Sequence, residues 1–346
     1  MKAVFQTLSI ALIVFLASNG YAQTGGNNAY EFLNLSNSAR IAAMGGNFLA
    51  VDDNDITLTQ ANPSLINASM NKSLALGFVD YYSDINYGFA MYCRDFKKVG
   101  NLAGSLQYIS YGDFKLTNEQ GEVQGNFNAG EYAFNVGWGR TLDTVFRIGA
   151  NAKMILSNLE TYNSLGVAVD VAGSYVPDNN TCVSLLFRNI GRQITAYSSG
   201  DVEPLPFEIQ LGMSHRLEHM PFRVSLLLTH LEKWDLTYDE PDNQTSSVNE
   251  SSSRSDVGEF ADKAFRHVVI GGEFMPAKFL SIRLGYNYQR RQEMTIASKT
   301  GMVGFSWGLG IRVSKFGINY SRSQYHLSGS PNYITITTNL GDWAKK

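Results

Sequence analysis

Apolar and polar residues alternate one by one along most of the chain. Phe146 and Ile148 share one face of such a stretch, whereas Arg147 and Asn151 share the other. The same alternation recurs in four further stretches, at 132–139, 165–172, 282–289 and 305–312. A period of two places successive side chains on opposite sides of a β-strand. The pattern therefore predicts many strands, each with one apolar face and one small, polar or charged face.

Fourteen segments have this pattern. They lie near 73–82, 85–93, 101–111, 131–140, 146–158, 164–175, 182–189, 207–215, 222–230, 267–274, 281–290, 303–313, 316–325 and 333–340. Most approach the roughly 9–11 residues with which a tilted strand crosses a bilayer, whereas strands in soluble proteins average roughly 5–6. An even number of long strands, apolar on one face, is typical of outer-membrane barrels, where closure leaves no unpaired edge in lipid. We therefore expect an all-β fold, a transmembrane outer-membrane β-barrel of about 14 antiparallel strands over residues 73–346.

The connections between these segments alternate in length. Short links follow the second, fourth, sixth, eighth, tenth and twelfth strands, and long ones follow the third, seventh, ninth and eleventh, at 112–130, 190–206, 231–266 and 291–302. Outer-membrane barrels have short periplasmic turns and longer outer loops. This parity predicts an integral protein of the cell outer membrane, with its long loops extracellular and both termini periplasmic.

The composition excludes two other classes of protein. The chain has 346 residues, of which only 17% are charged, and its mean hydropathy is −0.15. Outside residues 8–17 no stretch approaches the roughly 20 apolar residues of a membrane-spanning helix. A net charge of −3 gives no general electrostatic case for binding nucleic acid.

Residues 1–22 have the pattern of a secretory signal peptide. Lys2 precedes the apolar run 8–17, and Gly20 and Ala22 place small residues before a cleavage point at residue 22. No cysteine follows the apolar run, so a lipid anchor is not expected. The two cysteines of the exported chain, Cys93 and Cys182, are interpreted as packing residues on different strands, because a single pair makes no disulfide framework.

Residues 23–72 do not alternate and precede the first predicted strand. A short helix is expected at 38–44, capped by Ser36 or Ser38 and ended by Gly45-Gly46. This N-terminal segment is either a periplasmic arm or a plug folded into the lumen, and its small residues and lack of a charge run favour the plug.

The cluster of Asp52, Asp53 and Asp55 invites comparison with a calcium loop. Such a loop carries Gly at its sixth position and Glu at its twelfth, and DDNDITLTQANP has neither. A solvated or arginine-paired turn is the favoured interpretation, and no metal or other cofactor is expected.

Charged residues recur on the faces expected to line the lumen. They are Arg147, Lys153, Arg188, Arg223, Arg283, Arg312, Asp170, Glu208 and Glu273. Either they line a conduit or they form ion pairs in an interior that must be polar, and the presence of both signs favours ion pairs.

Aromatic girdles at the membrane surfaces are expected from Tyr81, Tyr82, Tyr87, Tyr108, Tyr111, Trp138 and Trp307. The chain has no nucleophile, phosphate-binding or zinc-protease motif, so we expect no enzyme activity.

Short motifs spread along the chain resemble one known family. Near the N-terminus they are Gly25-Gly26, Tyr30-Glu31-Phe32-Leu33, Ser38-Ala39-Arg40, Gly45-Gly46, the cluster 52–55 and Asn62-Pro63-Ser64-Leu65. Further matches occur at 80–88, 107–112, 188–191, 204–207, 221–223, 230–231 and 234–237. In order and spacing they resemble the PorV and PorQ family of FadL-like outer-membrane barrels from Bacteroidota.

This resemblance implies a component of the type IX secretion system. PorQ-like members hold the surface protein PorZ, and with PorU and PorV they form the attachment complex that cuts the C-terminal signal of cargo and joins cargo to lipopolysaccharide. The alternative is a FadL-like transporter of small hydrophobic compounds. If a surface partner is bound, aromatic residues of the long loops are expected to anchor it; they are Phe114, Phe127, Tyr197, Trp234 and Tyr238.

Overall fold

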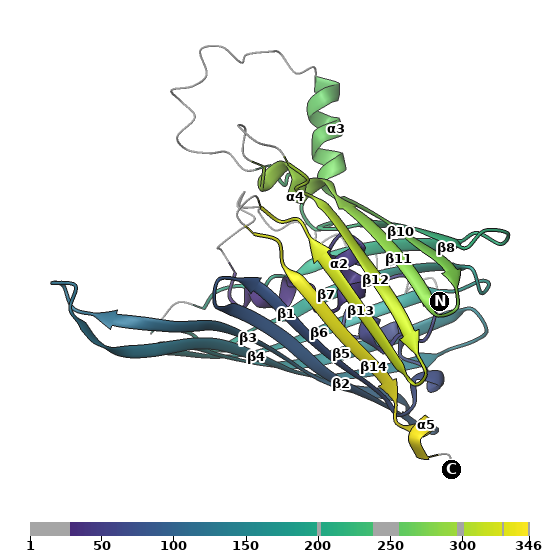
Figure 1. The fold of residues 1–346 in the computed structure, drawn as a ribbon, viewed down its shortest axis with the longest axis horizontal. Helices are drawn as coiled ribbons and strands as arrows, with labels where there is room; N and C mark the ends of the chain where they lie inside the picture. Colours follow the sequence, from purple (N-terminus) through teal and green to yellow (C-terminus); the bar gives the residue numbers. More distant parts are fainter. Residues whose placement is uncertain (1–27, 199–201, 238–255, 296–300, 327–328, 345–346) are drawn as a thin grey trace, which may run out of the picture.

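A single closed barrel forms the protein in the computed structural model. The structure describes residues 28–198, 202–237, 256–295, 301–326 and 329–344, and the predicted signal peptide lies outside these ranges. Each strand pairs in antiparallel fashion with its neighbours in sequence, and β1 pairs with β14 to close the ring (Figure 1). The predicted fold of fourteen antiparallel strands is confirmed.

The strands mostly begin and end close to the predicted boundaries. They are β1 (Ser73–Tyr82), β2 (Ile85–Phe96), β3 (Gly100–Thr117), β4 (Val123–Thr141), β5 (Phe146–Leu159), β6 (Tyr162–Tyr175), β7 (Thr181–Thr195), β8 (Glu208–Arg216), β9 (Phe222–Leu228), β10 (Val268–Ala277), β11 (Leu280–Asn287), β12 (Phe305–Val313), β13 (Phe316–Ser323) and β14 (Asn332–Asn339). We call the end with the turns after β2, β4, β6, β8, β10 and β12 the short-turn end, and the opposite end the long-loop end. At the long-loop end β3, β4 and β7 extend well beyond their predicted boundaries.

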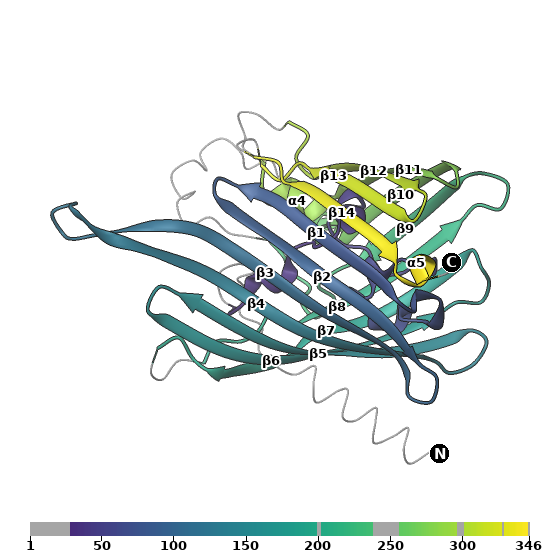
Figure 2. The same ribbon diagram turned by 60° about the horizontal axis from the view of Figure 1, so that its bottom comes forward.

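The predicted long loops contain regular structure. The predicted loop 190–206 begins within β7, which continues to Thr195. The stretch 112–130 is mostly strand, because β3 and β4 stay paired through Thr117 and Val123 and extend beyond their neighbours as a two-stranded ribbon (Figure 2). The loop 231–266 ends in helix α3 (Asp256–Arg266). Residues predicted to end the eleventh strand instead form α4 (Tyr288–Glu293), whose first turn is capped by the side chain of Asn287. No helix in the described part of the chain is long and apolar enough to cross a membrane.

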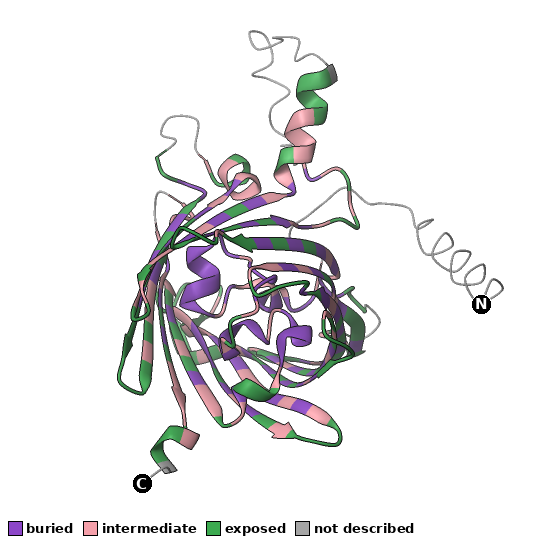
Figure 3. Ribbon diagram, turned by 90° about the vertical axis from the view of Figure 1, so that its right-hand side faces the viewer, coloured by how far each residue is buried: buried purple, intermediate pink, exposed green. Residues whose placement is uncertain are grey.

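The two faces of the wall differ as the alternation predicts. Along β5 and β6 the outward positions are mostly exposed and apolar, whereas the inward positions are mostly buried and small or polar. Figure 3 shows buried and exposed residues alternating along strands of the wall. Exposed Leu, Ile, Val and Phe side chains recur around the outside of the ring, so the barrel presents the apolar belt of a membrane-spanning barrel. The predicted girdle is wrong for Tyr81, Tyr87 and Tyr111, which pack inside the barrel.

Residues 28–72, here called the N-terminal segment, lie inside the ring of strands (Figure 3). The segment forms η1 (Glu31–Asn34), α2 (Ala39–Ala43), η2 (Ile56–Leu58), η3 (Pro63–Leu65) and η4 (Ala68–Met70). Helix α2 begins where Ser38 accepts a hydrogen bond from the Ile41 N–H, and it ends at Gly45 and Gly46, both with positive φ. Buried residues of this segment and of the inner wall together make up the core.

Candidate functional site in the barrel lumen

Close backbone contact sets the position of α2 against the wall. The helix packs on β11–β14, and the Ala39 N–H donates to the Thr335 hydroxyl at 2.9 Å. A Cβ on Gly285 would lie 2.1 Å from the Gly45 nitrogen, and one on Gly45 would lie 2.5 Å from the Val269 side chain. At Gly285 a larger residue would displace the backbone of α2, and at Gly45 the positive φ and the Val269 side chain oppose one, so the two glycines allow the end of α2 to lie directly against β11.

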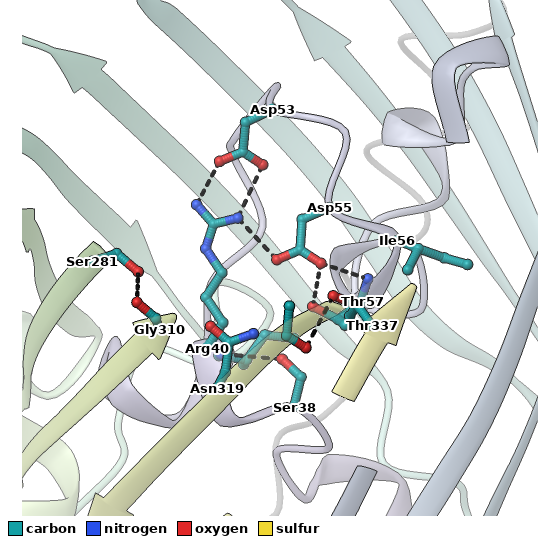
Figure 4. A network of polar contacts seen from close by, with 12 residues as sticks. Ser38, Arg40, Asp53, Asp55, Ile56, Thr57, Ser281, Gly310, Asn319 and Thr337 are labelled. Carbon is teal, nitrogen blue, oxygen red and sulfur yellow. Dashed lines mark hydrogen bonds and ion pairs between the residues drawn. The ribbon is translucent and has the colours of Figure 1, made fainter. Parts of the chain in front are cut away.

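Arg40, on α2, is the centre of a buried network of charges. Its guanidinium donates to both oxygens of Asp53, at 2.9 and 2.6 Å, and to Asp55 at 3.0 Å (Figure 4). The same group reaches the wall, where it donates to the two oxygens of Glu273 at 2.9 and 2.8 Å. The predicted aspartate cluster is therefore paired with arginine. Asp53 and Asp55 pair with Arg40 of the same N-terminal segment, and Asp53 also pairs with Arg223 of the wall.

Glu273, on β10, joins this segment to three strands of the wall. It is fully buried and also accepts hydrogen bonds from Arg223 of β9 and Arg283 of β11, each at 2.7 Å. Three guanidinium groups thus meet three carboxylates, so the network is neutral. Buried charges persist only when they are paired and hydrogen-bonded, and removing one partner leaves another charge uncompensated.

Further contacts fasten the segment on the opposite side of the lumen. Asp52 accepts two hydrogen bonds from Arg147 of β5, at 2.5 and 2.7 Å. Ser64, in η3, lies 2.6 Å from the Ser174 hydroxyl of β6. The N-terminal segment is therefore held by charged or polar contacts to strands on both sides of the barrel.

Towards the long-loop end the lumen becomes aromatic. Tyr30 and Phe32 of the N-terminal segment pack with Tyr87, Ile109 and Leu205 of the barrel in one buried cluster. The rings of Tyr81 and Tyr111 lie against this cluster. Aromatic side chains offer large, polarisable surfaces to an apolar ligand, so this half of the lumen is chemically unlike the charged half.

The wall is interrupted beside the aromatic cluster. β8 pairs with β7 only from Thr181 to Arg188, although β7 continues along β6 to Thr195. The connection before β8 turns inward there, so that Leu205 is buried and the Pro206 carbonyl accepts from the Asn189 side chain at 2.8 Å. Asn189 itself has φ of 57°, which bends β7 at this point.

A buried ion pair supports the bend in β7. Lys153 of β5 lies 2.8 Å from Asp170 of β6 and donates to the Asn189 side chain at 2.7 Å. The second oxygen of Asp170 accepts from the Asn189 main-chain N–H at 2.8 Å. These side chains replace the main-chain pairing that β6 and β7 lose at the irregularity, so specific side chains hold the bend in β7 in place.

A polar cavity of about 880 Å³ lies at the short-turn end, next to the charge network. Arg40, Asp53 and Glu273 form part of its lining, and Lys315 and Asp342 lie in the lining near the short turns. This space connects the network with the short-turn end, and its lining is chemically distinct from the aromatic cluster.

The residues predicted as partner anchors lie in different surroundings. Phe114 and Phe127 stack across the ribbon of β3 and β4 with centroids 5.2 Å apart, and Trp234 is exposed at the long-loop end. Tyr197 instead points into the lumen, where its hydroxyl lies 2.7 Å from Ser157. Tyr238 lies outside the described residues. The anchoring role stays a prediction for all five, and the inward position of Tyr197 does not favour it.

The alternation predicts charged residues in the lumen but does not indicate that Arg40 is the centre of their network. A signal was present, because Arg40 is the one basic residue between residues 23 and 71, a stretch that also holds Asp52, Asp53 and Asp55. The aromatic cluster and the interrupted wall had no comparable signal, because both depend on which distant segments fold inward.

Comparison with known proteins identifies the fold. No protein-family model matches the chain, and no curated protein matches it in sequence. Among solved structures, the Pseudomonas putida toluene transporter TodX is similar with a TM-score of 0.51 and 10% identity, over 88% of this chain and 96% of that one. The monoaromatic hydrocarbon channel CymD is similar with a TM-score of 0.51 and 11% identity, over 90% of this chain and 99% of that one. At such low identity the similarity concerns the fold alone, a closed β-barrel of the outer-membrane type.

Proposed function

We propose that this protein binds small hydrophobic compounds in its lumen and passes them across the outer membrane. The observation that carries the proposal is the aromatic cluster lying directly beside the interruption between β7 and β8. Similarity to a toluene transporter and a monoaromatic hydrocarbon channel supports it. An apolar compound would enter from the long-loop end or through the interrupted wall, and onward passage would require the N-terminal segment to shift within the lumen.

The proposal is tested by uptake of toluene into cells that carry the barrel. Leu205→Arg places a charge inside the interruption and should reduce uptake to the level of cells without the protein. Val202→Arg is the matched control, because Val202 belongs to the same connection but is exposed; it should leave uptake unchanged. A heat-modifiable band on electrophoresis checks that both variants fold. Equal uptake by the wild type and Leu205→Arg would contradict the proposal.

A second candidate function follows from the sequence resemblance. The protein would be a PorQ-like anchor of a PorZ-like surface protein, within the attachment complex that includes PorU and PorV. One structural observation favours it: the ribbon of β3 and β4 carries Phe114, Leu116, Val123 and Phe127 on one face, beyond the neighbouring strands. Exposed aromatic side chains of this kind dominate the energetics of many protein interfaces.

The two candidates are separated by one pair of variants. Under the anchor hypothesis, Phe114→Ser with Phe127→Ser should release the surface partner into the medium and stall cargo attachment, with toluene uptake intact. Lys115→Ser with Asn126→Ser alters the opposite face of the same ribbon and should release nothing. Retained partner and normal cargo attachment in the first double variant would contradict anchoring by the ribbon.

A further inference from the structure

Helix α3 is an amphipathic helix that stands apart from the barrel. It precedes β10 at the long-loop end and points away from the ring of strands in both side and end views (Figures 1 and 3). At 100° per residue, Val257, Phe260 and Phe265 fall on one side of the helix and Glu259, Asp262 and Lys263 on the other.

The polar side of α3 is attached to the protein. Lys263 forms an ion pair with Asp235 of the preceding connection at 2.9 Å. Asp262 accepts from the Tyr288 hydroxyl of α4 at 2.8 Å and pairs with Arg266 at 2.9 Å. The charged groups of the helix thus find their partners within the chain and face the rim of the barrel.

The apolar side of α3 is largely exposed, although the Phe265 ring lies 5.8 Å from the ring of Tyr288 in α4. Val257 is 77% exposed, Phe260 61% and Phe265 55%. Trp234, itself 53% exposed, packs against the Phe260 ring with centroids 5.2 Å apart and enlarges the same surface. A helix on the surface of a water-soluble protein has the reverse orientation, with its apolar side towards the core. The exposed apolar side of α3 is therefore suited to apolar surroundings.

We infer that α3 lies on the membrane surface around the barrel, with Val257, Phe260 and Phe265 in the apolar part of the lipid. The helix leads directly into the membrane-facing belt, since a single residue separates α3 from β10, and β10 carries exposed Ile270, which pairs with exposed Leu226 of β9. The helix also points away from the mouth of the barrel, the direction in which lipid lies. Amphipathic helices with this division of side chains bind lipid interfaces through their buried apolar area.

The inference is tested on the intact protein in vesicles of phosphatidylethanolamine and phosphatidylglycerol that contain phosphatidylcholine brominated near the top of its acyl chains. A polarity-sensitive fluorophore is attached to Val257→Cys or, as matched control, to Glu259→Cys. Both side chains are exposed and lie two residues apart on opposite sides of α3. The unmodified protein, taken through the same labelling, measures the background from buried Cys93 and Cys182.

Lipid contact predicts blue-shifted emission at position 257 and several-fold stronger quenching by brominated lipid there than at position 259. Absence of quenching at 257, or equal quenching at both positions, would overturn the inference. Shielding at 257 that appears only as protein concentration rises would also overturn it, because the apolar side would then bind a second copy of the chain. Shielding at 257 that requires an added surface protein would assign the same side to a protein partner and would likewise contradict lipid binding.

Discussion

Ala168 and Val169 are neighbours on β6 and meet opposite surroundings. Val169 is 42% exposed on the membrane-facing side, whereas Ala168 is 2% exposed and packs against the N-terminal segment. On the outer face any apolar side chain of moderate size satisfies the lipid. On the inner face a buried charge needs particular partners, as Glu273 does with three arginines. The outer face is therefore defined by a class of residue, and the inner face by specific pairs.

The largest loss of stability is expected from removing the Glu273 carboxylate at the centre of the charge network on the inner face. Glu273→Gln keeps the shape of the side chain but leaves Arg40, Arg223 and Arg283 with too little negative charge. Breaking a buried ion pair in this way should lower the free energy of unfolding by about 3–5 kcal/mol. Urea titration of the barrel in phospholipid vesicles measures the loss, and faster proteolysis within residues 28–72 would show that the N-terminal segment has loosened.

Ser306→Ala is the control for that variant. Ser306 is buried on the inner face of β12, and its hydroxyl has no hydrogen-bond partner among the described residues. Its removal should change the free energy of unfolding very little. A similar loss in both variants would mean that any inner-face substitution disturbs the barrel, and that the charge network has no special role.

The next effect concerns the outer face. Val169→Arg places a charge in the membrane-facing belt and should cost about 2–4 kcal/mol near the middle of the bilayer. Ala168→Ser, one residue away on the inner face, should cost much less because that face already accepts polar groups. The same urea titration compares the two variants, and equal tolerance at the two positions would show that the register of β6 is wrong.

The difference between the two faces also explains which parts of the fold the sequence alone predicts. The outer face repeats every second residue, so alternation was enough to predict fourteen strands, their order and most boundaries. It failed at residues 112–130, where strand continues past the expected end, because exposed ribbon and loop share polar residues. It failed again at Tyr288, where the Asn287 cap starts a helix in place of further strand.

For the inner face, the sequence predicts which charged residues point into the lumen but not how they pair. Alternation assigns Glu273, Arg223 and Arg283 to the lumen correctly. Nothing local indicates that Glu273 pairs with both arginines and also with Arg40, more than 180 residues earlier in the chain. The inward turn of Leu205 depends likewise on contacts with Ala29 and its neighbours. Such pairings follow from the closed topology, which brings distant segments together.

A smaller effect on stability, dependent on pH, is expected at the rim of the barrel. His230, just after β9, lies 3.1 Å from Glu232 and 3.8 Å from Glu208. Burial alone would lower the pKa of His230, but these carboxylates outweigh burial and raise that pKa to about 9. Because the folded pKa exceeds the ordinary value of 6.5, protonation stabilises the rim fully below that value, and the stabilisation is lost as pH rises through about 9.

The comparison of wild type with His230→Gln measures this contribution. The variant should be less stable than the wild type at about pH 6, and the difference should disappear near about pH 10. Titration of the His230 ring by nuclear magnetic resonance in detergent micelles locates the transition directly. A difference in stability that is constant across this range would show that the imidazole contributes by packing and not by charge.

The smallest effect on stability is expected from breaking ion pairs that lie outside the barrel. Lys263 on α3 pairs with Asp235 and Glu259, whose side chains are 45% and 63% exposed. Water screens such pairs and ordering the side chains opposes them, so Lys263→Ala should leave the urea midpoint of the barrel within experimental error. The same variant should also leave the quenching at position 257 unchanged, because Asp262 and Tyr288 still hold the polar side of the helix to the rim. A large loss of stability would instead show that α3 supports the barrel, and the specific pairing that distinguishes the inner face would then extend to the rim.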